Sequence, residues 1–210
     1  MQLIVITYPD FIAEEATKIN ALFDAGLELL HLRKPQASKE DYLSLLNAIH
    51  SQYHAKIKIH EYFECIDDYN LLGVHLNARN PMYKGVKQAN MSKSCHSLDE
   101  LSKIDEYDYV FLSPIFDSIS KEGYTSNFSN EMLKEASCQG IINDKVIALG
   151  GIDKETLPLI KHYAFGGVAV LGSVWKGENV VNCFAQLKIE NEQHCNGRSN
   201  SPFEGGEGDV

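Results

Sequence analysis

The sequence is short of positive charge, of cysteine pairs and of long apolar runs, and each shortage excludes a class of protein. Its 19 Lys and Arg against 29 Asp and Glu give a net charge of −10, which argues against a nucleic-acid partner. The 5 cysteines are scattered, without a C-x-x-C pair, and do not form the pattern of a disulfide framework. No apolar run approaches the roughly 18 residues of a membrane span, so we expect no membrane partner.

The first residues also lack the features of a secretion signal. No basic residue precedes the apolar segment that begins at Leu3, and the segment ends at Pro9. It is too short for the core of a signal peptide and is better interpreted as a strand. Together with the unpaired cysteines, this predicts a cytoplasmic protein.

What the chain does contain is a repeated unit, a short apolar strand followed by an amphipathic helix. Strands that are apolar almost throughout are typical of a parallel sheet buried on both faces. Eight units allow such a sheet to close, so we predict an α/β protein with a single (β/α)8 TIM barrel rather than an open doubly wound sheet. The predicted strands are 3–8, 27–32, 55–59, 73–76, 91–95, 107–112, 145–149 and 167–171.

The barrel is expected to be a single domain. A length of 210 residues with 44% hydrophobic residues suits one compact unit, which we assign to residues 1–190. Residues 191–210 have no apolar period and are rich in Gly, Asn, Ser and Glu. We expect this segment to be a short, disordered C-terminal tail outside the fold.

Polar residues indicate where several helices begin. Asp10 is expected to cap the first helix, and Ser38 opens a capping-box pattern before the second. The last helix is predicted as one segment, 173–187. His50 and His54 stand four residues apart, as zinc ligands do, but they lie near a helix end and are interpreted as surface residues.

In a barrel of this kind, the chemistry lies at the ends of the strands and in the loops that follow them. Polar, charged and glycine residues at those positions are therefore the candidates for a functional site. They are Arg33, Lys34, His60, Glu61, Asn80, Ser94, Ser118, Ser120, Lys121, Gly151, Gly172 and Ser173.

Glycines after the last two strands predict a phosphate site. Gly150 and Gly151 follow the seventh strand, and Gly172 with Ser173 follows the eighth. Without a Cβ, backbone N–H groups can approach an anion closely, and the helix that follows adds a favourable dipole. The alternative is that Gly150 and Gly151 merely form a tight turn.

Cations and oxygen ligands on other loops suggest a second anion and a metal ion. Arg33 and Lys34 follow the second strand, where they could meet an anionic group together with Lys121. Glu61 and Asn80 offer oxygen atoms of the kind that Mg²⁺ prefers. A single carboxylate is weak evidence, and Glu61 could equally serve only to begin a helix.

Several short segments, taken in their order along the chain, resemble one protein family. The chain resembles the thiamine-phosphate synthase superfamily of (β/α)8 barrels, which includes the thiazole tautomerases, from about Leu3 to Leu187. No single motif is decisive, but their order and spacing together are specific. The segments that carry the resemblance are Leu32-Arg33, Gly73-Val74-His75-Leu76, Ser94-x-His96, Asp108-Tyr109-Val110, Pro114-Ile115-Phe116, Ala148-Leu149-Gly150-Gly151-Ile152 and Gly167-Val168-Ala169-Val170.

The resemblance implies an enzyme of thiamine biosynthesis. The family's synthase joins hydroxymethylpyrimidine pyrophosphate to thiazole phosphate and releases pyrophosphate with the help of Mg²⁺, and a homodimer is the family-level expectation. It also implies roles for particular residues. Pyrophosphate contacts are implied for Arg33, Lys121 and Ser94, thiazole phosphate contacts for Ser118, Ser120, Gly151, Gly172 and Ser173, and further substrate contacts for Lys34 and His60.

The sequence departs from the family where the metal should bind. His60-Glu61 replaces an Asn-Asp pair, and Asn80 replaces a metal-binding Asp. Because charge is lost, we expect Mg²⁺ binding to be weak. Two alternatives to the synthase therefore stay open: a thiazole tautomerase, which needs no pyrophosphate, and a phosphate-binding barrel without catalysis.

Overall fold

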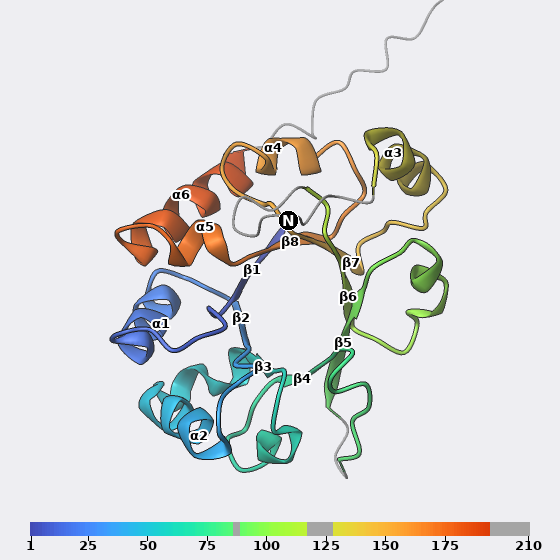
Figure 1. Cartoon of the computed structure of the whole chain (residues 1–210). Coiled ribbons are helices and arrows are strands. Elements are labelled where there is room, and N and C mark those ends of the chain that lie inside the picture. Colours follow the sequence, from blue (N-terminus) through green and yellow to red (C-terminus); the bar gives the residue numbers. More distant parts are fainter. Residues whose placement is uncertain (86–88, 117–127, 194–210) are drawn as a thin grey trace, which may run out of the picture.

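The computed structural model describes residues 1–85, 89–116 and 128–193, and it confirms the predicted barrel. Eight parallel strands follow one another in sequence order and close into a ring, with helices around the outside (Figure 1). The strands are β1 (Gln2–Ile6), β2 (Leu29–Leu32), β3 (Ile57–Ile59), β4 (Gly73–Leu76), β5 (Asn90–Cys95), β6 (Tyr109–Leu112), β7 (Val146–Leu149) and β8 (Gly167–Val170).

The connections contain α-helices and short 3-10 helices. The α-helices are α1 (Glu15–Asp24), α2 (Lys39–Ala48), α3 (Asn130–Cys138), α4 (Leu157–Ile160), α5 (Gly172–Trp175) and α6 (Val180–Gln193). The 3-10 helices are η1 (Ser51–Lys56), η2 (Phe63–Ile66) and η3 (Asp99–Lys103). No helix among the described residues is long and apolar enough to cross a membrane.

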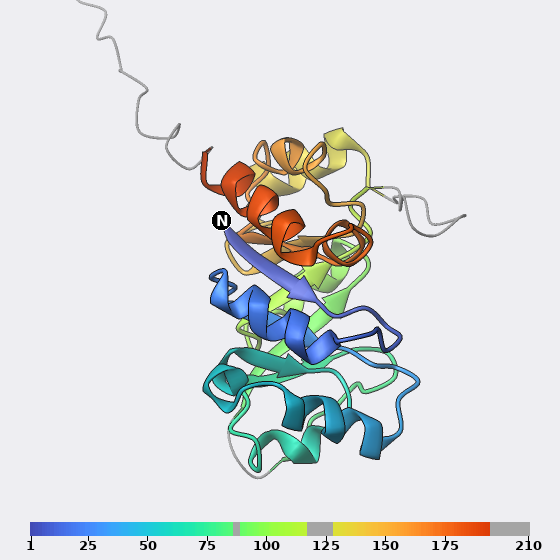
Figure 2. The ribbon, with the colours of Figure 1, turned by 90° about the vertical axis from the view of Figure 1, so that its left-hand side faces the viewer.

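The first and last strands close the barrel. β1 pairs with β2 on one side and with β8 on the other, where Gln2 lies opposite Gly167. A Cβ on Gly167 would come within 2.5 Å of the Gln2 carbonyl oxygen, so a glycine is needed for the strands to approach here. Figure 2 shows α1 and α6 on either side of β1, where they cover the seam.

The barrel interior is divided into an apolar part and a polar part. Strand side chains alternate between the interior and the helices, and Ile4, Ile6, Ile147 and Ala169 form a buried cluster separate from the main core under the helices. Strands β2 to β5 contribute polar side chains that are just as buried. These are His31, Lys58, His75 and Ser92, with His60 directly after β3.

The predicted start of a helix agrees with the structure where the predicted capping residue makes its hydrogen bond. The Ser38 hydroxyl accepts a hydrogen bond from the Asp41 amide at 3.1 Å, as the capping box predicts. The prediction for Asp10 is wrong, because α1 begins five residues later, after Glu14 in a left-handed conformation. The predicted helix 173–187 is also wrong in extent, since it is divided into α5 and α6.

Two further predictions, the exposure of His54 and the end of the barrel domain, can be compared with the structure. His54 is not a surface residue: it is buried, and its Nε2 lies 3.2 Å from the carbonyl oxygens of Leu46 and Ile49. Helix α6 continues to Gln193, three residues past the predicted end of the barrel domain. The rest of the predicted tail, 194–210, lies outside the described residues.

Candidate functional site

The carboxyl ends of the strands meet at one rim of the barrel and bring several predicted residues together. Arg33 follows β2, Glu61 follows β3, Asn80 lies in the loop after β4, and Ser94 is near the end of β5. Gly151 and Gly172 follow β7 and β8 on the same rim. The predicted Ser118, Ser120 and Lys121 lie outside the described residues.

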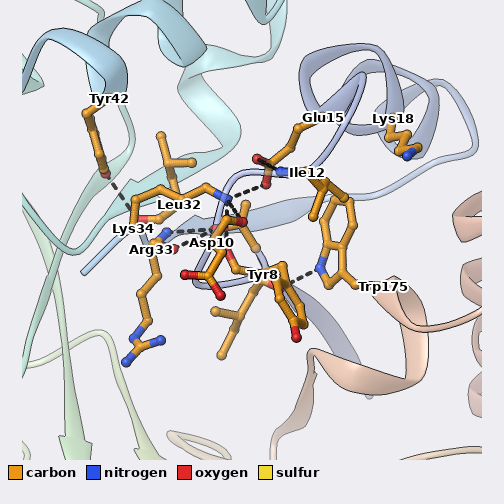
Figure 3. Close-up of polar contacts among 12 residues, drawn as sticks. Tyr8, Asp10, Ile12, Glu15, Lys18, Leu32, Arg33, Lys34, Tyr42 and Trp175 are labelled. Atoms are coloured by element: carbon orange, nitrogen blue, oxygen red, sulfur yellow. Dashed lines mark hydrogen bonds and ion pairs between the residues drawn. The ribbon is translucent and has the colours of Figure 1, made fainter. Parts of the chain in front are cut away.

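Arg33 is held in place through its backbone. The buried Thr7 hydroxyl accepts a hydrogen bond from the Arg33 amide at 2.9 Å and donates one to the Arg33 carbonyl at 3.1 Å. The guanidinium makes no ion pair with a described residue, and in Figure 3 it extends away from the neighbouring Lys34 ammonium. Burial, and then the positive charge of Arg79, lower the pKa of Arg33, although the side chain stays charged.

Arg79 is a further candidate residue, to which the sequence pattern assigned no role. Its charge acts on the pKa of Arg33, His60 and Glu61, so these groups share one electrostatic environment. The Asn77 side-chain oxygen accepts the Arg79 amide at 3.0 Å and shapes the loop. The available signal was its position: Arg79 follows β4 as Arg33 follows β2. Two guanidiniums that repel each other at a rim are suited to share a multiply charged anion.

Lys34 requires a correction. The prediction of a substrate contact is wrong, because the side chain is 0% exposed and its ammonium points toward Glu15, away from the Arg33 guanidinium (Figure 3). Its ammonium donates to Glu15 Oε1 at 2.6 Å and to the carbonyl oxygens of Tyr8 and Asp10 at 2.7 and 2.8 Å. All three protons are used, so Lys34 secures the loop between β1 and α1.

Glu61 and Asn80 retain oxygen atoms that suit a cation. One Glu61 oxygen accepts the Lys34 amide at 3.0 Å, whereas Oε1 is buried without a hydrogen-bond partner among the described residues. Burial raises the pKa of Glu61. The Asn80 amide nitrogen donates to the His60 carbonyl at 2.7 Å, which leaves the side-chain oxygen as the group available to a metal. This donor set fits Mg²⁺ with less charge than two aspartates would supply.

His60 and Ser94 contact buried histidines beneath the rim. The His60 ring is 4% exposed, with Nε2 2.9 Å from His31 Nδ1. The half-buried Ser94 hydroxyl lies 2.9 Å from Nε2 of His75. His60 therefore points into the barrel, whereas Ser94 lies between the interior and the rim.

The loops after β7 and β8 have features of a phosphate cradle. Gly150 and Gly151 have φ angles of 103° and 64°, a left-handed backbone that favours glycine. The Thr156 hydroxyl donates to the Gly151 carbonyl at 2.8 Å and so turns this loop. The Ser173 hydroxyl oxygen is buried without a hydrogen-bond partner in the described part of the chain, as expected of a group that awaits a ligand.

Comparison with known proteins identifies the family. The family model described as thiamine monophosphate synthase matches residues 3–174, which run from β1 into α5. The chain belongs to the thiamine monophosphate synthase family. The resemblance predicted from the sequence is thereby confirmed.

Individual members of the thiamine monophosphate synthase family match over most of their length. A thiamine phosphate pyrophosphorylase structure from Bacteroides thetaiotaomicron is 42% identical with a TM-score of 0.82, covering 90% of this chain and 97% of the other. A thiamine-phosphate synthase from Citrobacter koseri is 24% identical, covering 86% of this chain and 89% of the other. The pyrophosphorylase from Pyrococcus furiosus, 18% identical with a TM-score of 0.76, supports the fold alone.

Proposed function

We propose that this protein is a thiamine-phosphate synthase, which joins hydroxymethylpyrimidine pyrophosphate to thiazole phosphate. The observation that supports the proposal is that two groups of residues suited to bind anions lie on one rim, in a member of this family. Arg33 and Arg79 follow β2 and β4, whereas Gly151 lies in the loop after β7 and Ser173 lies in α5, directly after β8. A reaction between two phosphorylated substrates needs two such sites.

The chemistry of a leaving pyrophosphate supports this assignment of residues. The bond between the pyrimidine methylene carbon and the pyrophosphate oxygen breaks, and its electron pair leaves with pyrophosphate. The thiazole nitrogen then donates its lone pair to the cationic carbon. Arg33 and Arg79 would stabilise the charge that grows on pyrophosphate, while Gly151 and Ser173 would hold the thiazole phosphate.

Other residues keep supporting roles in this proposal. Glu61 and Asn80 would hold Mg²⁺, which would supply further positive charge to the pyrophosphate. Ser94 stays a predicted pyrophosphate contact, and Ser118, Ser120 and Lys121 stay predicted contacts on the loop after β6. A cytoplasmic location and a homodimer also stay predictions.

The thiazole tautomerase is the second candidate because of one contact. Tautomerisation needs a group that moves a proton, and the Ser94 hydroxyl is hydrogen-bonded to His75. Burial lowers the pKa of His75 to about 3, so this ring is neutral at pH 7. The synthase is favoured because a tautomerase acts on one phosphorylated substrate and has no pyrophosphate for Arg33 and Arg79 to bind.

The test is a coupled assay with both substrates and a Mg²⁺ titration. We expect Mg²⁺-dependent release of pyrophosphate with an equal amount of thiamine phosphate. Isomerisation of carboxythiazole phosphate without any pyrimidine substrate would establish the tautomerase instead. Binding of both phosphorylated compounds without turnover would leave a phosphate-binding barrel.

A further inference from the structure

Three buried histidines form a cluster inside the barrel that the proposed reaction does not use. His31 comes from β2, His75 from β4, and His60 directly follows β3, so three neighbouring strands contribute one ring each. Their exposed fractions are 0%, 0% and 4%. Each offers one ring nitrogen, and these three nitrogens all lie within 4.8 Å of one another.

The spacing of the rings suits three ligands of one ion. Metal–nitrogen bonds of about 2.0 Å and tetrahedral angles place the centres of three imidazoles about 5 Å apart. The observed centre-to-centre distances are 5.1 Å for His31–His60, 5.1 Å for His31–His75 and 4.3 Å for His60–His75. The His60 and His75 rings are stacked with an interplanar angle of 25°, so binding requires the His75 ring to move away and turn one nitrogen toward the ion.

Oxygen atoms next to two of the rings would orient them for binding. Metal-bound histidine usually donates its second ring N–H to an oxygen, which selects the tautomer. The Tyr109 hydroxyl lies 2.5 Å from His31 Nε2, so Nδ1 of that ring faces His60. Ser92 and Ser94 each place a hydroxyl 2.9 Å from one nitrogen of His75. Binding of an ion by one nitrogen breaks its hydrogen bond to serine, while the other nitrogen keeps its own.

The electrostatic state of the cluster also suits a metal ion. Burial lowers the pKa of all three histidines, and neutral imidazole is the form that binds metals. The charges that oppose a bound cation are Lys58, which lowers the pKa of His31 and His75, and Arg33 and Arg79, which lower that of His60. The Lys58 ammonium is partly neutralised by an Asp108 carboxylate oxygen 3.4 Å away.

We propose that His31, His60 and His75 bind one divalent transition-metal ion, for which zinc is the best match. Three imidazoles and no carboxylate suit Zn²⁺ and disfavour Mg²⁺, which prefers oxygen ligands. Binding replaces the 2.9 Å contact between His31 and His60 with two bonds to the ion. His31 then carries its proton on Nε2, toward Tyr109. The site adjoins the proposed Mg²⁺ ligands, since His60 precedes Glu61 and its carbonyl accepts the Asn80 amide, but it uses different side chains.

The test is metal binding by the full chain after treatment with a chelator. We expect Zn²⁺ to bind at one ion per chain in calorimetry, and Co²⁺ to give the intense visible bands of a tetrahedral site. His31→Gln and His75→Gln should each weaken Zn²⁺ binding by more than about 100-fold, because loss of a supporting partner alone costs 10–100-fold. Tyr109→Phe removes only a supporting partner, so it should weaken Zn²⁺ binding by about 10–100-fold.

His50→Gln is the control, because this histidine is exposed and outside the cluster. Its Zn²⁺ affinity should equal that of the unmodified chain. Binding that survives in His31→Gln and His75→Gln, or a weak octahedral Co²⁺ spectrum, would overturn the proposal. If those variants fail to fold, X-ray absorption of the zinc-loaded unmodified chain decides: three imidazole ligands are expected, and one or none refutes the site. None of these measurements depends on synthase activity.

Discussion

At the scale of single residues, adjacent cations in this chain have opposite roles. Arg33 and Lys34 are neighbours, but Thr7 holds the Arg33 backbone at the rim while the Lys34 ammonium is buried against Glu15. The pKa of Lys34 is lowered and that of Glu15 is raised, in both cases mainly by burial, so the pair depends on its mutual contact. Lys34 therefore bears on stability, whereas the proposed function gives Arg33 a role in the chemistry.

Removing Lys34 should destabilise the barrel. Lys34→Met leaves the Glu15 carboxylate buried without its cation, which should lower the free energy of unfolding by about 3–5 kcal/mol in urea titrations. The double variant Lys34→Met/Glu15→Met should recover part of that loss, because no orphaned charge is left. A single variant as stable as the unmodified chain would show that the pair is not structural.

Removing either rim guanidinium should slow the reaction. Arg33→Ala and Arg79→Ala should each lower the turnover of bound substrates by about 100-fold, because they act on charge that develops as pyrophosphate leaves. Thiazole phosphate binding should change much less. Lys39→Ala is the control, since this exposed lysine only pairs with the exposed Glu64. Unchanged turnover in Arg79→Ala would remove it from the proposed mechanism.

Restoring charge at position 80 should strengthen the metal site. A carboxylate binds Mg²⁺ more strongly than an amide, so Asn80→Asp should lower the Mg²⁺ concentration for half-maximal pyrophosphate release. A Mg²⁺ titration of initial rates measures the change. If the requirement and the turnover both stay as they were, Asn80 is not a metal ligand.

At the scale of elements, backbone hydrogen bonds join the loop after β6 to the loop after β7. The Ile115 amide donates to the Leu149 carbonyl at 3.0 Å, and the Phe116 amide donates to the Gly150 carbonyl at 3.1 Å. A Cβ on Gly150 would come within 2.9 Å of Pro114. The glycines therefore serve loop packing as well as the backbone conformation, and Gly151 is the better probe of anion binding.

A Cβ at Gly151 should weaken phosphate binding. Gly151→Ala should reduce thiazole phosphate affinity by about 100-fold in calorimetry, as expected for two lost backbone hydrogen bonds to an anion. Gly140→Ala is a matched control, because Gly140 also has a left-handed φ of 74° but has open space around its Cβ position. If the two variants bind thiazole phosphate equally well, the cradle lies elsewhere.

At the scale of the whole molecule, the polar part of the barrel interior should set the pH dependence of stability. Lys58 is 1% exposed, and burial lowers its pKa from 10.5 to about 8. Its only ion-pair partner in the described structure, the Asp108 side chain, is 47% exposed. Between pH 8 and 10.5 the unfolded chain therefore binds more protons at Lys58 than the folded chain does.

Because the unfolded chain binds more protons at Lys58, the stability of the protein should depend on pH in a measurable way. The contribution of Lys58 to stability should rise as the pH increases from about 8 to 10.5, by at most about 1.4 kcal/mol per pH unit. Lys58→Met should be more stable than the unmodified chain at pH 7, and the gap should narrow toward pH 10. Urea unfolding of both proteins across this range measures it. A gap that does not change with pH would contradict the lowered pKa.

The barrel was predictable from the sequence because each strand is a local pattern. Apolar runs at regular spacing define eight strands, and Ser38 caps its helix through an amide only three residues away. The glycines after β7 and β8 could be found in the same way, since a loop position follows from where its strand ends. Lys34, His54 and Arg79 could not be assigned correctly, because their environments come from distant segments.

Only the tertiary structure decided which side chains meet inside the barrel. His31, His60 and His75 are far apart in the chain, and they converge because neighbouring parallel strands turn them to the same interior. Tertiary packing likewise brings Lys34 against Glu15 of α1 and leaves Arg33 at the rim. Local patterns therefore determined the strands and their order, whereas burial and pairing across strands decided which of the polar residues are free to bind a ligand.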